Sequence, residues 1–297
     1  MKPVALYFII EDRSCILLAI AARLKTPSTL YTSISYLLMM RFVVLKLLAV
    51  VLLLVLTFTV RAQNNRISDH NKIGWMAGFV TFQVHPKWGF HNEYQFRRAD
   101  YFKHWQQGLF RVGVSYQLAK DVLVRLGGAY VNTYNYGEIP IQAAGKTFQE
   151  LRAFQMIQLT DKKGGLDLHH RFMLEQRWVG AYSNGALTKP DKTVYTNRLR
   201  YLFRMQLPLS GTKTTGKQWY AATFDEVLIG FGKNVNNNVF DQNRLGIVAG
   251  CKFSTTLRIE GGYLNQIVQL GRTVNTQQVF QYNQGFIVNT FINIQTY

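Results

Sequence analysis

Residues 197–207 read NRLRYLFRMQL, and apolar and polar side chains alternate along this stretch. One parity is apolar and holds Leu199, Tyr201, Phe203, Met205 and Leu207. The other parity is mostly polar and holds Arg198, Arg200, Arg204 and Gln206. Because successive side chains of a β-strand point to opposite faces, the pattern predicts a strand with one apolar face and one charged face.

The same alternation recurs on both sides of this stretch, clearly at residues 88–97, 110–118, 244–253 and 257–266. It predicts eleven strands, near residues 73–84, 88–98, 105–118, 121–133, 147–160, 167–179, 194–208, 218–231, 240–253, 255–270 and 284–295. Single-chain bacterial barrels usually have an even number, so we expect ten or twelve strands. Short connections alternate with longer polar ones at residues 134–146, 180–193, 232–239 and 271–283.

Long alternating strands joined by alternately short and long connections predict an all-β fold, an antiparallel up-and-down transmembrane β-barrel of about 10–12 strands. A soluble β-sandwich is the alternative, since its strands also alternate. The barrel is favoured because these strands exceed the usual five or six residues of globular sheets. The polar parity also carries glycine and Arg/Glu pairs, as a packed lumen would.

The composition agrees with a membrane barrel. Charged residues make up 17% of the chain, against about 25% in soluble domains, and aromatic residues make up 14%. The net charge is +18, but the basic residues are scattered and no nucleic-acid motif is present, so nucleic-acid binding is not expected. Of the two cysteines, only Cys251 follows the expected cleavage site, so we expect no disulfide, no cysteine metal site and no cofactor.

The N-terminal region predicts export. Residues 40–62 contain a basic start, a Leu/Val run to Val60 and a small residue at Ala62, which is the plan of a cleaved signal peptide. Residues 1–39 do not fit that plan, and we interpret them as a mis-annotated upstream extension with the true start at Met39 or Met40. The barrel then occupies residues 63–297. A transmembrane helix at residues 42–60 is the alternative, because about 18 apolar residues can cross a bilayer.

Five segments of the chain read HHRFMLEQRW (169–178), RLRYLFRMQLPL (198–209), FDEVLIGFG (224–232), FDQNRLG (240–246) and GYLNQ (262–266). They resemble an outer-membrane family of Gram-negative bacteria known as domain of unknown function 2490. The resemblance covers most of the chain after the signal peptide. It implies a barrel in the outer membrane and supplies no activity.

The polar parity of the strands predicts a basic lumen lined by Glu93, Arg97, Arg171, Glu175, Arg177, Arg198, Arg200, Arg204, Glu226, Arg244, Arg258 and Glu260. One interpretation is a porin-like pore, because rings of Arg and Lys favour anions. The other is structural: buried charges must be paired, and Arg–Glu ladders fill a barrel too narrow for an open channel. We favour the structural interpretation.

An outer-membrane barrel hydrolase acting on lipid is the remaining alternative, and it would use His169 or His170 as base. No serine stands in a G-x-S-x-G setting and none clearly pairs with these histidines. Adjacent strand residues also point to opposite faces, so the two histidines do not share a metal. We therefore expect that the chain is not an enzyme. Expected partners are outer-membrane lipid, the barrel-assembly machinery and a small anionic solute, while the oligomeric state stays open.

Overall fold

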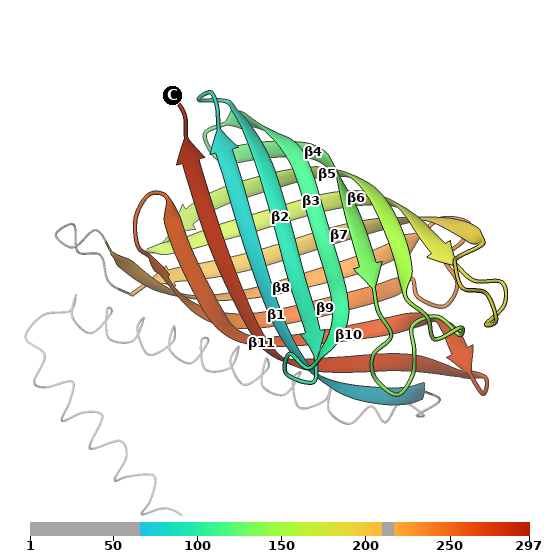
Figure 1. Cartoon of the computed structure of the whole chain (residues 1–297). Helices are drawn as coiled ribbons and strands as arrows, with labels where there is room; N and C mark the ends of the chain where they lie inside the picture. The colour runs from blue at the N-terminus through green and yellow to red at the C-terminus, as the bar shows by residue number, and fades with distance from the viewer. Residues whose placement is uncertain (1–65, 210–216) are drawn as a thin grey trace, which may run out of the picture. The chain divides into compact units, whose positions relative to one another are not determined.

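The computed structural model describes residues 66–209 and 217–297, and every regular element there is a β-strand (Figure 1). The strands are β1 (Arg66–Gln83), β2 (Trp88–Ala99), β3 (His104–Ala119), β4 (Val122–Thr133), β5 (Phe148–Lys163), β6 (Leu166–Ala181), β7 (Lys192–Pro208), β8 (Gln218–Phe231), β9 (Phe240–Lys252), β10 (Leu257–Val274) and β11 (Gln277–Gln295). Among the described residues, no helix is long and apolar enough to cross a membrane. The predicted upstream extension, signal peptide and alternative anchor at 42–60 lie outside the described residues.

The eleven strands form one closed barrel, which confirms the predicted all-β barrel fold. Each strand pairs antiparallel with its neighbours in sequence, and β1 closes the sheet by pairing parallel with β11. In an up-and-down barrel the strand direction alternates, so an odd number of strands makes the first and last run the same way. The single parallel seam is therefore a direct consequence of the odd strand number.

Two expectations about the strands are wrong. The alternation gives the correct number of eleven, whereas the preference for ten or twelve does not hold for this barrel. The predicted long loop at 271–283 is instead a tight hairpin, because β10 continues to Val274 and β11 begins at Gln277. Asn275 and Thr276 make the turn with positive φ angles of 49° and 65°. The strand ends around them are polar, which removes the alternation that predicts a strand.

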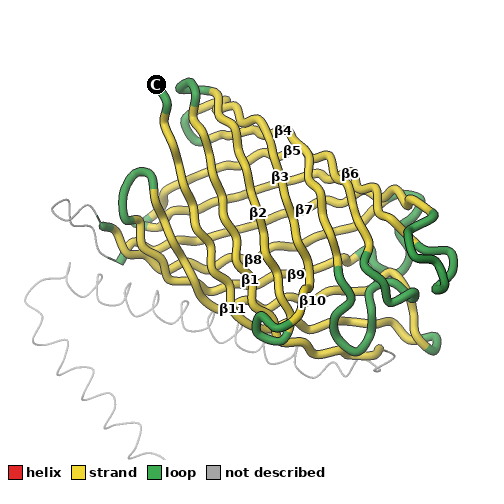
Figure 2. The backbone as a smooth tube through the Cα atoms, in the orientation of Figure 1, coloured by secondary structure: helices red, strands yellow, loops and turns green. Residues whose placement is uncertain are grey.

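The connections separate into two ends of the barrel (Figure 2). The long-loop end carries the β4–β5, β6–β7 and β8–β9 loops at residues 134–147, 182–191 and 232–239. The short-turn end carries residues 84–87, 120–121, 164–165 and 253–256. At the β5–β6 turn, Gly164 and Gly165 have positive φ angles of 58° and 84°, as a two-residue hairpin of the right-handed twist requires.

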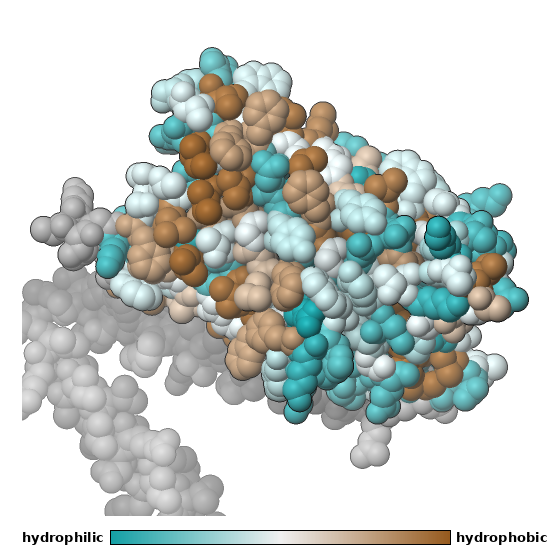
Figure 3. Space-filling model, in the orientation of Figure 1, coloured by the Kyte–Doolittle hydropathy of each residue, from teal (hydrophilic) through white to brown (hydrophobic). Residues whose placement is uncertain are grey.

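The outer face of the barrel is apolar. Large side chains on the outward parity remain exposed, with exposed fractions of 62% for Leu126, 60% for Ile247 and 56% for Phe286. Figure 3 shows brown and pale side chains over β1–β3 and β11, with teal side chains toward the long-loop end. Soluble monomers rarely expose apolar patches beyond a few hundred Å², so this face is unusual for a protein surface in water.

The inner face lets neighbouring strands approach closely at glycines. A Cβ on Gly285 would lie 1.8 Å from the Ile73 carbonyl oxygen across the parallel seam. A Cβ on Gly127 would lie 2.0 Å from the Val112 carbonyl oxygen on the β3 neighbour. Only glycine fits such close backbone contacts.

Candidate functional site in the charged lumen

The twelve residues predicted to line the lumen all lie inside the barrel. Eight are buried: Glu93, Arg97, Glu175, Arg198, Arg200, Glu226, Arg244 and Glu260. Arg171, Arg204 and Arg258 line an internal cavity, and Arg177 binds the buried Glu150. Strict alternation explains this placement, because a strand with its apolar parity outward turns every charged residue of the other parity inward.

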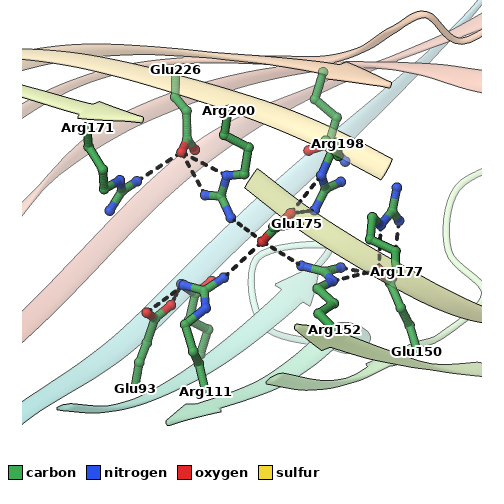
Figure 4. Close-up of polar contacts among 12 residues, drawn as sticks. Glu93, Arg111, Glu150, Arg152, Arg171, Glu175, Arg177, Arg198, Arg200 and Glu226 are labelled. Atoms are coloured by element: carbon green, nitrogen blue, oxygen red, sulfur yellow. Dashed lines mark hydrogen bonds and ion pairs between the residues drawn. The ribbon is translucent and has the colours of Figure 1, made fainter. Parts of the chain in front are cut away.

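Glu175 on β6 lies at the centre of the interior and is fully buried (Figure 4). Its Oε2 accepts hydrogen bonds from Nε and Nη2 of Arg198 at 2.8 and 2.6 Å. Its Oε1 accepts from Nη1 of Arg200 at 2.9 Å and Nη2 of Arg111 at 3.4 Å. Arg152 Nη1 approaches the same oxygen at 3.8 Å. Four arginines from β3, β5 and β7 thus surround one carboxylate.

Further carboxylates extend this cluster to other inward-facing arginines. Glu226 pairs with Arg171 at 2.9 Å, Arg200 at 2.7 Å and Arg244 at 3.1 Å. The other links join Arg198 to Asp241 at 2.7 Å, Arg111 to Glu93 at 2.7 Å, and Glu150 to both Arg152 and Arg177. We call these twelve residues the arginine–glutamate network; they are Glu93, Arg111, Glu150, Arg152, Arg171, Glu175, Arg177, Arg198, Arg200, Glu226, Asp241 and Arg244. Every arginine in it has a carboxylate partner.

The β4–β5 loop crosses the barrel at the long-loop end. Tyr136 is buried, and its hydroxyl donates to Gln281 Oε1 on β11 at 2.8 Å. Gln281 Nε2 donates to the Ile139 carbonyl at 2.9 Å, and Arg272 on β10 donates to the Pro140 carbonyl at 2.6 Å. Burial raises the pKa of the Tyr136 phenol, which keeps it protonated as a donor. Because β4 and β11 are not neighbours, these contacts span the lumen and close it.

A cavity of about 390 Å³ extends from the short-turn half of the lumen, where Arg125 and Arg258 line it, to the arginine–glutamate network, six members of which also line it. Eight arginines line it, against only three glutamates. Its apolar lining includes Phe79, Met156, Phe224, Leu264 and Phe291. Ligand pockets usually measure about 300–1,000 Å³ and combine apolar walls with a few polar groups. The cavity therefore has the size and lining of a small-molecule site, with an excess of positive charge.

Three arginines of this cavity, Arg97, Arg125 and Arg258, have no carboxylate within ion-pair distance among the described residues. Arg97 lies over the Trp75 ring at 4.0 Å and donates to Gln95 and Gln107. Arg258 on β10 stacks over the Phe291 ring at 3.9 Å, and its buried Nε has no hydrogen-bond partner. Arg125 on β4 donates from Nε to the Ser115 hydroxyl at 2.8 Å. By contrast, Arg204 binds Glu260 through two hydrogen bonds of 3.1 and 2.8 Å. The short-turn half thus holds guanidinium groups that the protein does not neutralise.

The sequence pattern missed five members of this interior: Arg111, Arg125, Glu150, Arg152 and Asp241. Arg111 stands on the polar parity of an alternating stretch, so parity alone could have found it. On β4 and β5 the inward positions also include Leu123, Phe154 and Met156, which form an internal apolar cluster with Met173. Where both faces are apolar, alternation no longer tells inside from outside, and Arg125, Glu150 and Arg152 are lost in that region.

The structure separates His169 from His170 as the alternation predicts. His169 lines the cavity, whereas His170 packs outside against Tyr201 and Phe203. Another histidine lies closer to a hydrolase geometry: His91 Nδ1 is 3.1 Å from the Thr81 hydroxyl, and its Nε2 is 3.8 Å from Glu93. The Glu93 carboxylate, however, is already bound by Arg111 at 2.7 Å.

The closed sheet and its charged interior define a class: a β-barrel protein with a packed, ionic lumen. Residues 73–277 match the family model described as "Protein of unknown function (DUF2490)", and the chain belongs to this family. The match runs from β1 to the first residue of β11 and confirms the family resemblance seen in the sequence. No curated protein matches the chain.

Proposed function

We propose that the chain is an outer-membrane β-barrel of a Gram-negative bacterium, exported through a cleaved signal peptide, with a structural role in place of a porin-like one. The outer face supports the membrane placement, because exposed Leu126, Ile247 and Phe286 would bury their apolar surface in lipid. Strands of 12–19 residues exceed the roughly 9–11 residues that a tilted transmembrane strand needs.

The single observation that carries the structural role is the occupied interior. The arginine–glutamate network fills the centre, and the β4–β5 loop lies across the long-loop end. A conducting pore needs a continuous polar path with water in it. Here the side chains of Glu175, Arg198 and Gln281 are at most 1% exposed in the path such a pore would take.

Planar-bilayer recordings of the refolded protein test this proposal. The wild-type barrel is expected to insert without a stable conductance. A variant that combines Tyr136→Ala with Glu175→Ala removes the loop anchor and the central carboxylate, and it should conduct or leak. Stable anion-selective channels from wild-type protein would contradict the proposal and favour the porin-like alternative.

The outer-membrane hydrolase remains a second candidate because Thr81, His91 and Glu93 follow the order hydroxyl, imidazole, carboxylate in one cavity. We propose that the chain is not an enzyme, since Arg111 already holds the carboxylate and a secondary hydroxyl is a poor nucleophile without strong activation. Ester and phospholipid hydrolysis by refolded protein, compared with His91→Ala and His169→Ala, distinguishes the two. Activity lost specifically in His91→Ala would support the hydrolase.

A further inference from the structure

The cavity in the short-turn half presents unneutralised cations on opposite walls. Arg125 lies on β4 and Arg258 on β10, which are five strand steps apart in a closed sheet of eleven. Both side chains line the same cavity. Neither has a carboxylate within ion-pair distance among the described residues, although the network arginines nearby all do.

Burying a charged group without a partner costs free energy, and proteins normally supply a counter-charge. The arginine–glutamate network follows this rule through Glu175, Glu226 and Glu150. Of the eight arginines that line the cavity, five have a carboxylate partner, while Arg97, Arg125 and Arg258 have none among the described residues. The missing negative charge is most simply supplied by a ligand.

The cavity also has apolar side chains among its polar ones. Phe79 and Phe291 stand near the short-turn end, while Phe224, Leu264 and Met156 lie deeper in the cavity. A purely inorganic anion would leave these walls without contacts. An organic anion can place its carbon chain against them and its charged groups against the guanidinium forks, whose planar geometry matches a carboxylate.

We propose that the cavity binds a short aliphatic dicarboxylate, one carboxylate at Arg258 and the other at Arg125, entering from the short-turn end. Arg258 is held in place by its stacking on Phe291 at 3.9 Å, and Arg125 by its hydrogen bond to Ser115. The remaining donors of each guanidinium are free to bind oxygen atoms. Among the described residues, Glu175 and Tyr136 are buried toward the long-loop end, which is why the proposal places the entrance at the other end.

This inference goes beyond the proposed function, because binding needs the cavity and not the membrane. Isothermal titration calorimetry on the refolded full-length barrel in amphipol at neutral pH tests it, with adipate as probe. Hexanoate has the same carbon chain with one carboxylate, hexanol has none, and inorganic phosphate lacks the apolar body. The expected order of affinity is adipate, then hexanoate, with hexanol and phosphate weakest.

Variants of the two arginines then test which arginine binds each carboxylate of adipate. Arg258→Gln and Arg125→Gln should each weaken adipate binding by about tenfold or more, because each removes a charge-assisted pair. Arg66→Gln is the matched control, since Arg66 stacks over the Phe280 ring at 5.4 Å on the exposed end of β1 and should change nothing. Folding of each variant is judged by heat-modifiable migration on gels. If one arginine variant fails to fold, the other still tests the predicted loss of adipate affinity.

Several results would overturn the inference. They are no adipate binding, equal affinity for adipate and hexanoate, equal affinity for phosphate, or unchanged adipate binding in the folded arginine variants. A conducting wild-type barrel would contradict the proposed structural role and leave the calorimetric result intact. The two proposals therefore fail separately.

Discussion

The two halves of the lumen handle buried charge in different ways. The arginine–glutamate network matches seven arginines with five carboxylates in one connected set of ion pairs, with Glu175 at its centre. It extends from the long-loop half to the wall of the cavity, where Arg171 and Glu226 belong to both. In the short-turn half, Arg125 and Arg258 face a cavity and lack such partners. Inward-facing arginines thus have two roles. Those with carboxylate partners fill the lumen, and those without partners line a positively charged cavity.

The contrast shows that a count of basic residues does not distinguish a channel from a closed barrel. Whether the lumen is filled depends on whether each guanidinium has a carboxylate partner on another strand. Arg198 lies between Glu175 and Asp241, whereas Arg258 lies against an aromatic ring. Substitutions of paired and unpaired arginines should therefore differ in how much they reduce the free energy of unfolding.

The largest effect is expected from Glu175→Gln in the long-loop half. Removing this charge leaves Arg198, Arg200 and Arg111 without their shared partner, and breaking a buried ion pair on one side costs about 3–5 kcal/mol. Denaturant unfolding in micelles should show that loss in the free energy of unfolding. Glu138→Gln, at an exposed position of the β4–β5 loop, is the control and should stay within about 0.5 kcal/mol of wild type. Equal stability of the two variants would refute the network's role.

A smaller loss is expected from Tyr136→Phe, which keeps the ring and removes the hydroxyl. Gln281 Oε1 then loses a 2.8 Å hydrogen bond in a fully buried position, at a cost of about 1–3 kcal/mol. Tyr134→Phe is a close control, because Tyr134 stacks on Trp105 and keeps that stacking as phenylalanine. The same unfolding assay compares them, and a larger loss for Tyr134→Phe would argue against the loop anchor.

How far the inward placement of the charged residues could be predicted from the sequence differs from strand to strand. On β7, Arg198, Arg200 and Arg204 alternate with large apolar residues, so their inward placement could be predicted directly. On β4 and β5, inward Leu123 and Phe154 hide the alternation, so Arg125 and Glu150 could not be found. Parity identifies a face and carries no information about which strands become neighbours across the barrel.

The strand pairing itself shows the same limit. Alternation located eleven strands, but the parallel seam between β1 and β11 depends on closure, which is a property of the whole sheet. The β4–β5 loop was correctly expected to be long. Its contact through Tyr136 with Gln281, 145 residues away, follows from barrel closure and has no local signal in the sequence.

In the short-turn half, Arg258→Gln should cost little stability. The substitution removes a charge that has no carboxylate partner among the described residues. The free energy of unfolding should therefore change by less than about 1 kcal/mol. Arg198→Gln is the matched change in the network and should lose about 3 kcal/mol or more. Similar losses in both variants would erase the distinction between the halves.

The smallest effect is expected from salt. Added sodium chloride screens the mutual repulsion of accessible charges, so it should stabilise the wild-type barrel by on the order of a few tenths of a kcal/mol. The gain should shrink in the Arg125→Gln, Arg258→Gln double variant, which has fewer unpaired cations. A salt response that is the same in both proteins would show that the cavity arginines are already neutralised.

The most direct test of the difference between the halves is a crystal of the barrel soaked in sodium bromide, with the anomalous signal of bromide measured. The account predicts peaks in the short-turn cavity beside Arg258 and Arg125, and none inside the arginine–glutamate network around Glu175. Bromide bound beside Arg198 or Arg152, or a short-turn cavity free of bromide while other sites are occupied, would contradict it.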